Sequence, residues 1–338
     1  MKKLFFGVIT LLFASLICAG CGENVLTGKP GSSGKTQELM VVATDGVYNN
    51  PLIKKEIDTI FTAPQVALNQ PEPRFDVVRV KPSDFDGNTM FQAHRNILIL
   101  DVNGQNDDKV YLEYDKWSTP QVVIRLAAKS YESLDSLLNA NQERLLKEFY
   151  NMEYRRMEKV FSGMPNVKIN NTIKEKYGFS LVFPDEFVLA KSEGPFTWIR
   201  KEAKDFGIGV LVDMCLYTGD NQLDEATILN HLDTIMKHHV PGPSDGSYMG
   251  TERRDFFYTR NVKLGDYDAV ETRGLWRLYN DFMSGPFVCY TLRSADSCSL
   301  ITLVGYVYSP SQRNSMVMKR DLLMQVDGIC RTYKVEPK

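Results

Sequence analysis

The pattern of apolar residues changes at Gly163-Met164-Pro165, and this change constrains the fold more than any other feature of the sequence. Before it, continuous apolar segments alternate with segments of helical spacing. After it, most segments alternate apolar and polar residues. Continuous apolar strands are typical of sheets covered on both faces, and alternating strands of antiparallel sheets. The sequence therefore predicts two domains, residues 38–164 and residues 166–338.

The first predicted domain is α/β, because helical patterns separate its strands. A helix is expected over residues 51–61, with Pro51 at its first position. Ser130 is expected to cap the longest helix of the chain, which ends at Gly163. That helix is longer than one small domain, so we expect it to kink or to project its 150–161 end towards the second domain. Strands are predicted at residues 38–44, 75–80, 96–102 and 121–127, with a weaker one at 110–114.

The second predicted domain is α+β, with an antiparallel sheet and two helices on one side of it. One helix is expected over residues 224–240, capped by Asp224, and the other over about residues 313–333. The strands are predicted at residues 178–183, 196–201, 207–217, 248–258, 267–278, 286–293 and 299–308.

Residues 1–20 resemble a bacterial lipoprotein signal peptide. Met1-Lys2-Lys3 precedes an apolar run of about 14 residues, which is shorter than the roughly 20 residues that span a bilayer. The run ends in Cys18-Ala19-Gly20-Cys21, which resembles a lipobox, although Cys18 stands where leucine is commoner. The resemblance implies cleavage before Cys21 and a lipid, palmitate included, on that cysteine. An ordinary secretory signal is the alternative.

Residues 21–37 are expected to form the lipidated cysteine and a flexible tether, because Gly22–Thr36 holds four glycines and little to bury. Such a segment would reach roughly 20 Å on average. We expect a protein anchored in the cell envelope and facing the periplasm, since residues 22–25 lack the acidic cluster of a surface-export signal. The choice between inner and outer membrane stays open.

The charge of the chain argues against a nucleic-acid partner. Without residues 1–20, which include Lys2 and Lys3, the chain has 38 basic and 42 acidic residues, a net charge of −4. No long block of like charge interrupts this balance. The spacing of the four remaining cysteines fits no zinc pattern: Cys215, Cys289, Cys298 and Cys330.

Cys289 and Cys298 are predicted not to bond to each other. A two-residue turn at Ala295-Asp296 would place Cys289 opposite Thr302. The two cysteines would then lie four residues out of register, roughly 13 Å apart. A disulfide needs Cα atoms within about 7 Å, so any bond would have to involve Cys215 or Cys330.

We find no catalytic, metal or nucleotide motif in the sequence. A G-x-S-x-G elbow is absent, and Gly31–Thr36 lacks the earlier glycine and the preceding strand of a phosphate loop. His231 and His238 lie seven residues apart on one predicted helix, too far apart to bind one metal directly. We therefore assign no catalytic residue, no metal ligand and no cofactor.

Three aromatic residues are the candidates for binding. Tyr306 and Tyr308 are two apart on a predicted strand and therefore share a face. Together with Trp276 they would suit a binding groove, although filling the core is the simpler interpretation.

The second half resembles two known groups of proteins. From Tyr177–Asp185 through Trp198 to the closing helix, the order of elements resembles the PsbP-like fold, seen in extracytoplasmic and lumenal proteins that mostly bind partners. The segments Arg273–Trp276, Met283–Phe287 and Gly305–Pro310 are similar to an uncharacterised family of Bacteroidetes envelope lipoproteins, a domain of unknown function. These resemblances imply a location and no activity, since a fold does not imply one.

The sequence thus predicts a cell-envelope lipoprotein that acts as a binding or assembly module. Its partners would be the membrane, through the lipid, and an unknown protein or envelope glycan. The alternative is a hydrolase of envelope polymers with a site at the domain junction. Converging carboxylates or a Ser/His pair there would favour the hydrolase, and an apolar aromatic groove the binding module.

Overall fold

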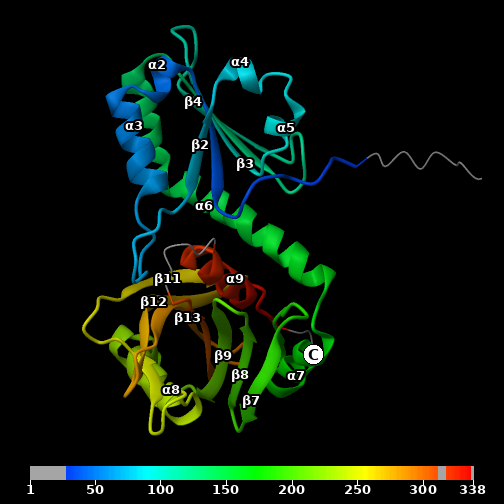
Figure 1. The fold of residues 1–338 in the computed structure, drawn as a ribbon, viewed down its shortest axis with the longest axis vertical. Coiled ribbons are helices and arrows are strands. Elements are labelled where there is room, and N and C mark those ends of the chain that lie inside the picture. The colour runs from blue at the N-terminus through cyan, green and yellow to red at the C-terminus, as the bar shows by residue number, and fades with distance from the viewer. Residues whose placement is uncertain (1–27, 311–316, 336–338) are drawn as a thin grey trace, which may run out of the picture.

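The computed structural model describes residues 28–310 and 317–335 (Figure 1). It has a five-stranded sheet in its N-terminal part and an eight-stranded sheet in its C-terminal part. This is the predicted fold class, an α/β domain followed by an α+β domain. The signal peptide and Cys21 lie outside the described residues. Within the described ranges, no helix combines the length and the apolar character needed to cross a bilayer.

The N-terminal sheet is mixed, with the strand order β2-β1-β3-β5-β4, and only β4 runs antiparallel. Pro51 occupies the first turn of α3, as predicted. Asn50 caps this helix, which continues into one π-helical turn, η1. The elements are β1 (Glu38–Val42), α2 (Asp45–Tyr48), α3 (Pro51–Ile57), η1 (Asp58–Thr62), β2 (Asp76–Val80), α4 (Pro82–Phe85), α5 (Thr89–Gln92), β3 (Asn96–Val102), β4 (Lys109–Tyr114) and β5 (Val122–Ala128).

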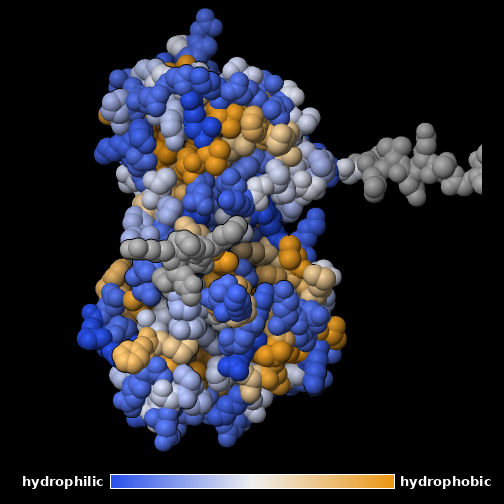
Figure 2. Space-filling model, viewed as in Figure 1, coloured by the Kyte–Doolittle hydropathy of each residue, from blue (hydrophilic) through white to orange (hydrophobic). Residues whose placement is uncertain are grey.

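The two faces of this sheet are covered unequally. Helix α3 and the start of the long helix pack on one face and bury a large core around Phe61, Phe75 and Phe149. The short helices α4 and α5, with Trp117, cover the other face over a smaller core. Figure 2 shows a hydrophobic area on this domain, between the places that α3 and α5 occupy in Figure 1.

The long helix α6 (Tyr131–Gly163) has 33 residues, and Ser130 caps it as predicted. The Ser130 hydroxyl accepts a hydrogen bond from the Ser133 N–H at 3.2 Å. Its first half packs in the N-terminal core, whereas Met157 and Phe161 belong to the core of the C-terminal domain. The helix therefore runs from one domain to the other (Figure 1), as its length of about 50 Å requires.

The C-terminal sheet is antiparallel, with the order β10-β12-β13-β14-β9-β8-β7, and β11 pairs with the same edge of β12 as β10 does. Its elements are α7 (Val167–Tyr177), β6 (Phe179–Ser180), β7 (Val188–Glu193), β8 (Phe196–Glu202), β9 (Gly207–Leu216), η2 (Asp220–Leu223), α8 (Glu225–His239), β10 (Tyr248–Thr251), β11 (Tyr258–Leu264), β12 (Tyr267–Tyr279), β13 (Ser284–Arg293), β14 (Ser299–Tyr308), α9 (Lys319–Arg331) and β15 (Lys334–Val335).

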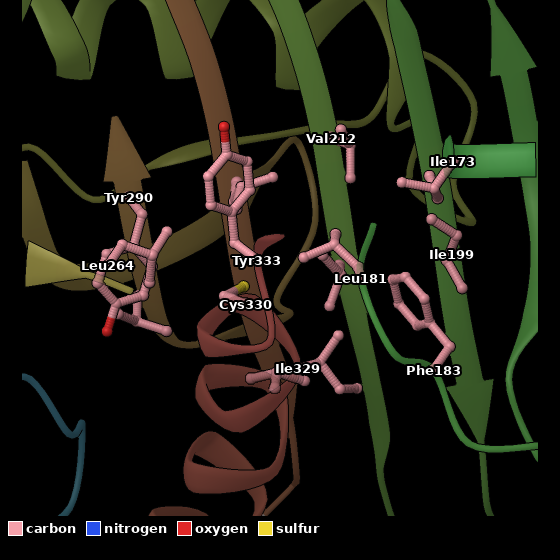
Figure 3. Close-up of a cluster of buried hydrophobic side chains, with 14 of the residues drawn as sticks. Ile173, Leu181, Phe183, Ile199, Val212, Leu264, Tyr290, Ile329, Cys330 and Tyr333 are labelled. Atoms are coloured by element: carbon pink, nitrogen blue, oxygen red, sulfur yellow. The ribbon is translucent and has the colours of Figure 1, made fainter. Parts of the chain in front are cut away.

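The helices of this domain lie on opposite faces of the sheet, and the prediction that they share one side was wrong. Helix α8 packs on the face that carries Phe287 and Cys289, and α9 and α7 pack on the face that carries Val288 and Tyr290. The physical reason is that β13 is buried on both faces over most of its length. Figure 3 shows Ile329 and Cys330 of α9 facing the strands that carry Val212 and Ile199.

Five elements of the C-terminal domain were not predicted: α7, β7, η2, β11 and β15. The strand expected at residues 178–183 is only the two-residue β6, which pairs with β15 outside the large sheet. The strand expected at residues 248–258 is interrupted, because six residues, 252–257, stand opposite the two residues 274 and 275 of β12.

The predicted register of the hairpin β13–β14 was wrong by two residues. Cys289 stands opposite Val304, not Thr302, because the loop has four residues, 295–298. The Asp296 carboxylate stabilises this longer loop by accepting hydrogen bonds from the Ser294 hydroxyl (2.6 Å) and the Cys298 N–H (3.1 Å). Cys289 and Cys298 are then six residues out of register, about 20 Å apart, and all four described cysteines are free.

The segment expected to be a flexible tether is attached to the N-terminal domain along its second half. Gly31 bridges to Thr119, and Ser33 bridges to His94. The Ser33 N–H donates to the Ala93 carbonyl at 2.9 Å, and the Arg95 N–H donates to the Ser33 carbonyl at 2.9 Å. Backbone hydrogen bonds therefore hold the segment in place despite its glycine-rich composition.

Candidate binding site

A pocket of about 510 Å³ opens beside the C-terminal end of α8, and residues of five strands of the large sheet line it: β8, β9, β10, β12 and β14. Its lining includes Trp276 of β12 and both Tyr306 and Tyr308 of β14, the three residues that the sequence singled out. The sheet thus brings together side chains that lie about 30 residues apart in the chain. Besides lining the pocket, Trp276 and Tyr306 are buried members of the hydrophobic core on this face of the sheet.

The aromatic wall has a defined geometry. The rings of Trp276 and Tyr306 meet edge to face with centroids 5.9 Å apart, and Trp276 and Tyr308 are 6.3 Å apart. The Trp276 indole N–H donates to the Val307 carbonyl at 3.0 Å, which fixes the ring. Such contacts contribute about 0.5–1.5 kcal/mol each beyond simple burial, so the wall is preformed.

Gly209 makes room for Tyr306. It stands opposite Tyr306 in the β9–β14 pairing, and a Cβ atom at this position would lie 2.6 Å from the tyrosine ring. The ring therefore lies across β9, and its hydroxyl accepts a hydrogen bond from the Trp198 indole N–H of β8 at 2.8 Å. Burial raises the pKa of Tyr306 well above its ordinary value. The Tyr306 hydroxyl therefore keeps its proton. Among the described residues, no group accepts a hydrogen bond from this hydroxyl.

Apolar side chains complete the pocket opposite the aromatic wall. Met249 and Leu278 are buried, and Met283 from the β12–β13 connection is partly exposed. The chain that leaves α8 approaches closely at Gly242, where a Cβ atom would lie 2.8 Å from Leu278 Cδ1. Methionine is flexible and polarisable, so this side of the pocket can adapt to an occupant.

A charged pair stands at one end of the pocket. The Arg200 guanidinium stacks over Trp198, 5.0 Å from the ring centroid, and its Nη1 lies 3.6 Å from Glu202 Oε1. The Nε atom of Arg200 is buried and has no hydrogen-bond partner in the described structure. A buried donor without a partner is costly, and an acceptor on a bound molecule would satisfy it.

Sequence reasoning did not identify Trp198 and Arg200, although a signal was present. They are two residues apart on the strand predicted at residues 196–201, and therefore share a face. The sequence does not show where that strand, β8, lies in the sheet. In the structure, β9 lies between β8 and β14.

Carboxylates do converge near the domain junction. The Tyr290 hydroxyl lies 3.0 Å from Glu271 Oε2 and 2.6 Å from Asp327 Oδ1. All four carboxylate oxygens accept further hydrogen bonds, from Arg273, Arg331, Arg260 and from Tyr154 of α6. No sequence pattern indicates this network, because its members come from five elements: α6, β11, β12, β13 and α9.

This network is closed, with three arginines around two carboxylates. Burial alone would raise the pKa of Asp327, but Arg331 and Arg273 outweigh it and hold the pKa well below its usual value. For Glu271, burial is likewise outweighed by Arg273, and its pKa is lowered. Both carboxylates are thus ionised and paired, and neither is a free acid or base.

The histidines form no metal site in the described structure. His231 Nε2 lies 3.0 Å from Asp213 Oδ2, and His238 Nδ1 lies 2.8 Å from the Thr234 carbonyl of its own helix. No group of three or more His, Cys, Asp or Glu side chains that suits a metal ion occurs among residues 28–310 and 317–335.

Comparisons with solved structures find similarity to about half of the chain. The Ran-binding protein Mog1p of Saccharomyces cerevisiae is 10% identical, with a TM-score of 0.30, and the match covers 47% of this chain and 90% of that one. LpqN of Mycobacterium tuberculosis, involved in cell envelope biogenesis, is 15% identical, with a TM-score of 0.27 and coverage of 47% and 83%. No curated protein matches the sequence.

Family models match both halves. Residues 32–162 match a domain of unknown function, DUF8532, and residues 166–332 match another, DUF4837. Two domains of unknown function thus make up this chain, which is consistent with the uncharacterised family that its sequence resembles.

Proposed function

We propose that this protein is a binding module of the cell envelope, and that its C-terminal pocket takes a small apolar molecule with one anionic or acceptor group. The observation that carries the proposal is the pocket of about 510 Å³ walled by Trp276, Tyr306 and Tyr308. Small-molecule sites are mostly apolar and have volumes of roughly 300–1,000 Å³, and a few polar groups in them fix the orientation of the ligand.

The polar groups suggest how the ligand lies. The unpartnered Nε of Arg200 and the free proton of Tyr306 are both donors that an acceptor group can satisfy. The apolar body of the ligand would then contact Trp276, Leu278 and Met283. A hydrogen bond to a charged donor contributes about 1.5–3 kcal/mol, so an anionic ligand should bind more tightly than a neutral one of the same shape.

The location belongs to the same proposal. Cys18-Ala19-Gly20-Cys21 supports lipidation of Cys21 and a periplasm-facing position, in either membrane. The family resemblance supports a Bacteroidetes envelope lipoprotein, and the order of elements from α7 to α9 supports a PsbP-like C-terminal domain that binds a partner. An envelope glycan or protein that presents an apolar group is the corresponding class of partner.

A hydrolase with a site at the junction is the weaker candidate. Carboxylates converge there, as the hydrolase requires, but arginine and tyrosine donors occupy all four oxygens of Glu271 and Asp327. General acid–base catalysis needs a carboxyl that can exchange its proton with a substrate. The aromatic pocket lies elsewhere in the C-terminal domain and favours the binding module.

Two matched probes test the pocket. We expect 1-anilinonaphthalene-8-sulfonate, which is aromatic and anionic, to bind more tightly than the neutral N-phenyl-1-naphthylamine. Arg200→Gln should weaken the anionic probe about tenfold and leave the neutral probe unchanged. Met283→Trp should weaken both by filling the pocket.

The control is Arg254→Gln, whose side chain is 78% exposed away from the pocket and pairs with Glu252. It should leave the affinity of both probes unchanged. Binding of both probes that is insensitive to Met283→Trp would contradict the proposal.

A further inference from the structure

Residues 30–35 form a fixed connection between the N-terminal domain and the chain that precedes it. The Thr119 N–H donates to the Pro30 carbonyl at 2.9 Å, and the two hydrogen bonds of Ser33 follow three residues later. Lys29 extends the attachment through a hydrogen bond from Nζ to the Asp115 carbonyl. The segment thus lies between α5 and the β4–β5 connection.

Gly34 is the residue that permits this docking. Its φ of +99° is in the left-handed region, and a Cβ atom there would lie 2.6 Å from His94 Nε2. His94 is 5% exposed, and its Nδ1 lies 3.0 Å from the Asn96 carbonyl, so the ring cannot move aside easily. Any side chain at position 34 would therefore force the segment off the domain.

The docked segment limits how far the N-terminal domain can lie from a lipid on Cys21. If a lipid is attached at Cys21, only six residues, 22–27, lie between it and Gly28, the first described residue. The seven Cα–Cα steps from Cys21 to Gly28 span at most about 25 Å when fully extended. The part of the domain next to Gly28 must then lie within that distance of the membrane.

The surface beside this point suits a membrane interface. Met90 of α5 is 71% exposed, and Phe91 and Trp117 are partly exposed above the small core of this face. Lys116 Nζ lies 4.7 Å from the Trp117 ring centroid. Tryptophan and lysine are typical of the membrane–water interface, where the ring meets the acyl boundary and the amine reaches the headgroups. Figure 1 shows the chain leaving the domain below α5.

We propose that docking of residues 30–35 holds the surface of Met90, Phe91 and Trp117 against the phospholipid headgroups. The docked segment acts as a spacer of fixed length, so that the domain has one orientation on the membrane. The inference rests on the proposed lipid on Cys21. The inference adds to the proposed lipid anchor a membrane-facing surface, and it makes Gly34 responsible for the orientation of that surface.

Site-specific fluorescence quenching tests the orientation. The lipidated full-length chain, with Cys215→Ser and Cys298→Ser, is placed in vesicles of phosphatidylethanolamine and phosphatidylglycerol that contain a headgroup nitroxide lipid. A dye is attached through Met90→Cys or, as the matched control, through Phe282→Cys in the C-terminal domain, where the side chain is fully exposed. We expect quenching at position 90 to be at least about threefold stronger than at position 282.

Adding Gly34→Val should reduce quenching at position 90 to the level at position 282, because the maximum reach from Cys21 to the first attached residue rises from about 25 Å to about 50 Å. Ser33→Pro, which removes one docking hydrogen bond, is the milder variant if Gly34→Val fails to fold. Equal quenching at both positions, in protein that sediments with the vesicles, would overturn the orientation alone. Protein that does not sediment would remove the lipid anchor, and the inference with it.

Discussion

Glu72 of the N-terminal domain caps the helix α9 of the C-terminal domain at Arg320. Its Oε2 accepts a hydrogen bond from the Arg320 N–H at 2.8 Å, and its Oε1 accepts one from the Lys319 N–H at 3.0 Å. The residue at the N-cap position of the helix, Met318, has no side chain for this purpose. The side chain of Arg320 also contacts the N-terminal domain, since its buried guanidinium donates a hydrogen bond to Asp76 Oδ2 at 2.5 Å. Each domain therefore supplies hydrogen-bond partners for polar groups of the other domain.

Glu72→Ala should lower the free energy of unfolding by about 1–2 kcal/mol, because two backbone donors of α9 lose a charged acceptor. Chemical denaturation followed by circular dichroism measures the loss. Glu158→Ala, an exposed position on α6, is the matched control and should change stability by less than about 0.5 kcal/mol. Equal effects of the two substitutions would contradict the capping role.

A C-terminal fragment should be more stable when it keeps the second half of α6. Met157 and Phe161 are buried against α9, and each contributes about 1.5–3 kcal/mol by burial. We therefore expect residues 147–338 to unfold cooperatively and residues 166–338 to be less stable by about 3–6 kcal/mol. Equal midpoints in urea would show that the domain boundary lies at Pro165, as the sequence pattern alone predicts.

Gly209→Ala should destabilise the protein by about 1–3 kcal/mol through overpacking, because the added methyl group meets the ring of Tyr306. Displacement of this ring breaks the hydrogen bond from Trp198, so tryptophan fluorescence should shift in the folded state. Gly104→Ala is the control, since no atom lies within 4 Å of its Cβ position. An unchanged spectrum in a stable Gly209→Ala variant would refute the packing argument.

Asp321→Asn should stabilise the protein at pH 8 by about 1–3 kcal/mol, and the gain should disappear as the pH falls. Burial raises the pKa of Asp321 to about 6 in the folded state. Above pH 6 the carboxylate is ionised in both states, and the folded state bears the cost of its desolvation. Below the ordinary pKa of about 3.9 the group is neutral in both states, so the cost vanishes.

Urea denaturation of the Asp321→Asn variant and of the parent protein at pH 8, 6 and 4 measures this difference. Asp107→Asn, an exposed loop position, should show no comparable gain. A stabilisation that grows towards pH 4 would have the wrong sign for a raised carboxyl pKa.

Local sequence determined those elements whose own residues contain the cause. Ser130 caps α6 through its hydroxyl, Pro51 opens α3, and β3 and β14 have the predicted bounds because their apolar runs are continuous. Helix α7 was missed although Asn166 caps it and Ile169, Ile173 and Tyr177 share one face. Strand β7 was beyond sequence reasoning, since most of its residues are exposed and it follows no apolar alternation.

Tertiary structure alone decided the pocket and the charge network. Trp276 and Tyr306 were recognisable as candidates, but Trp198 and Arg200 join them only because β8 pairs with β9 and β9 with β14. The pairing of Glu271 with Arg331 depends on α9 crossing the sheet. The spacing of side chains along the sequence determines which of them share a face of a strand or helix. Which residues of other elements lie next to that face depends on strand order and register. Strand order follows from contacts across long stretches of chain, and the register of β13 and β14 depends on the length of the loop that Asp296 stabilises.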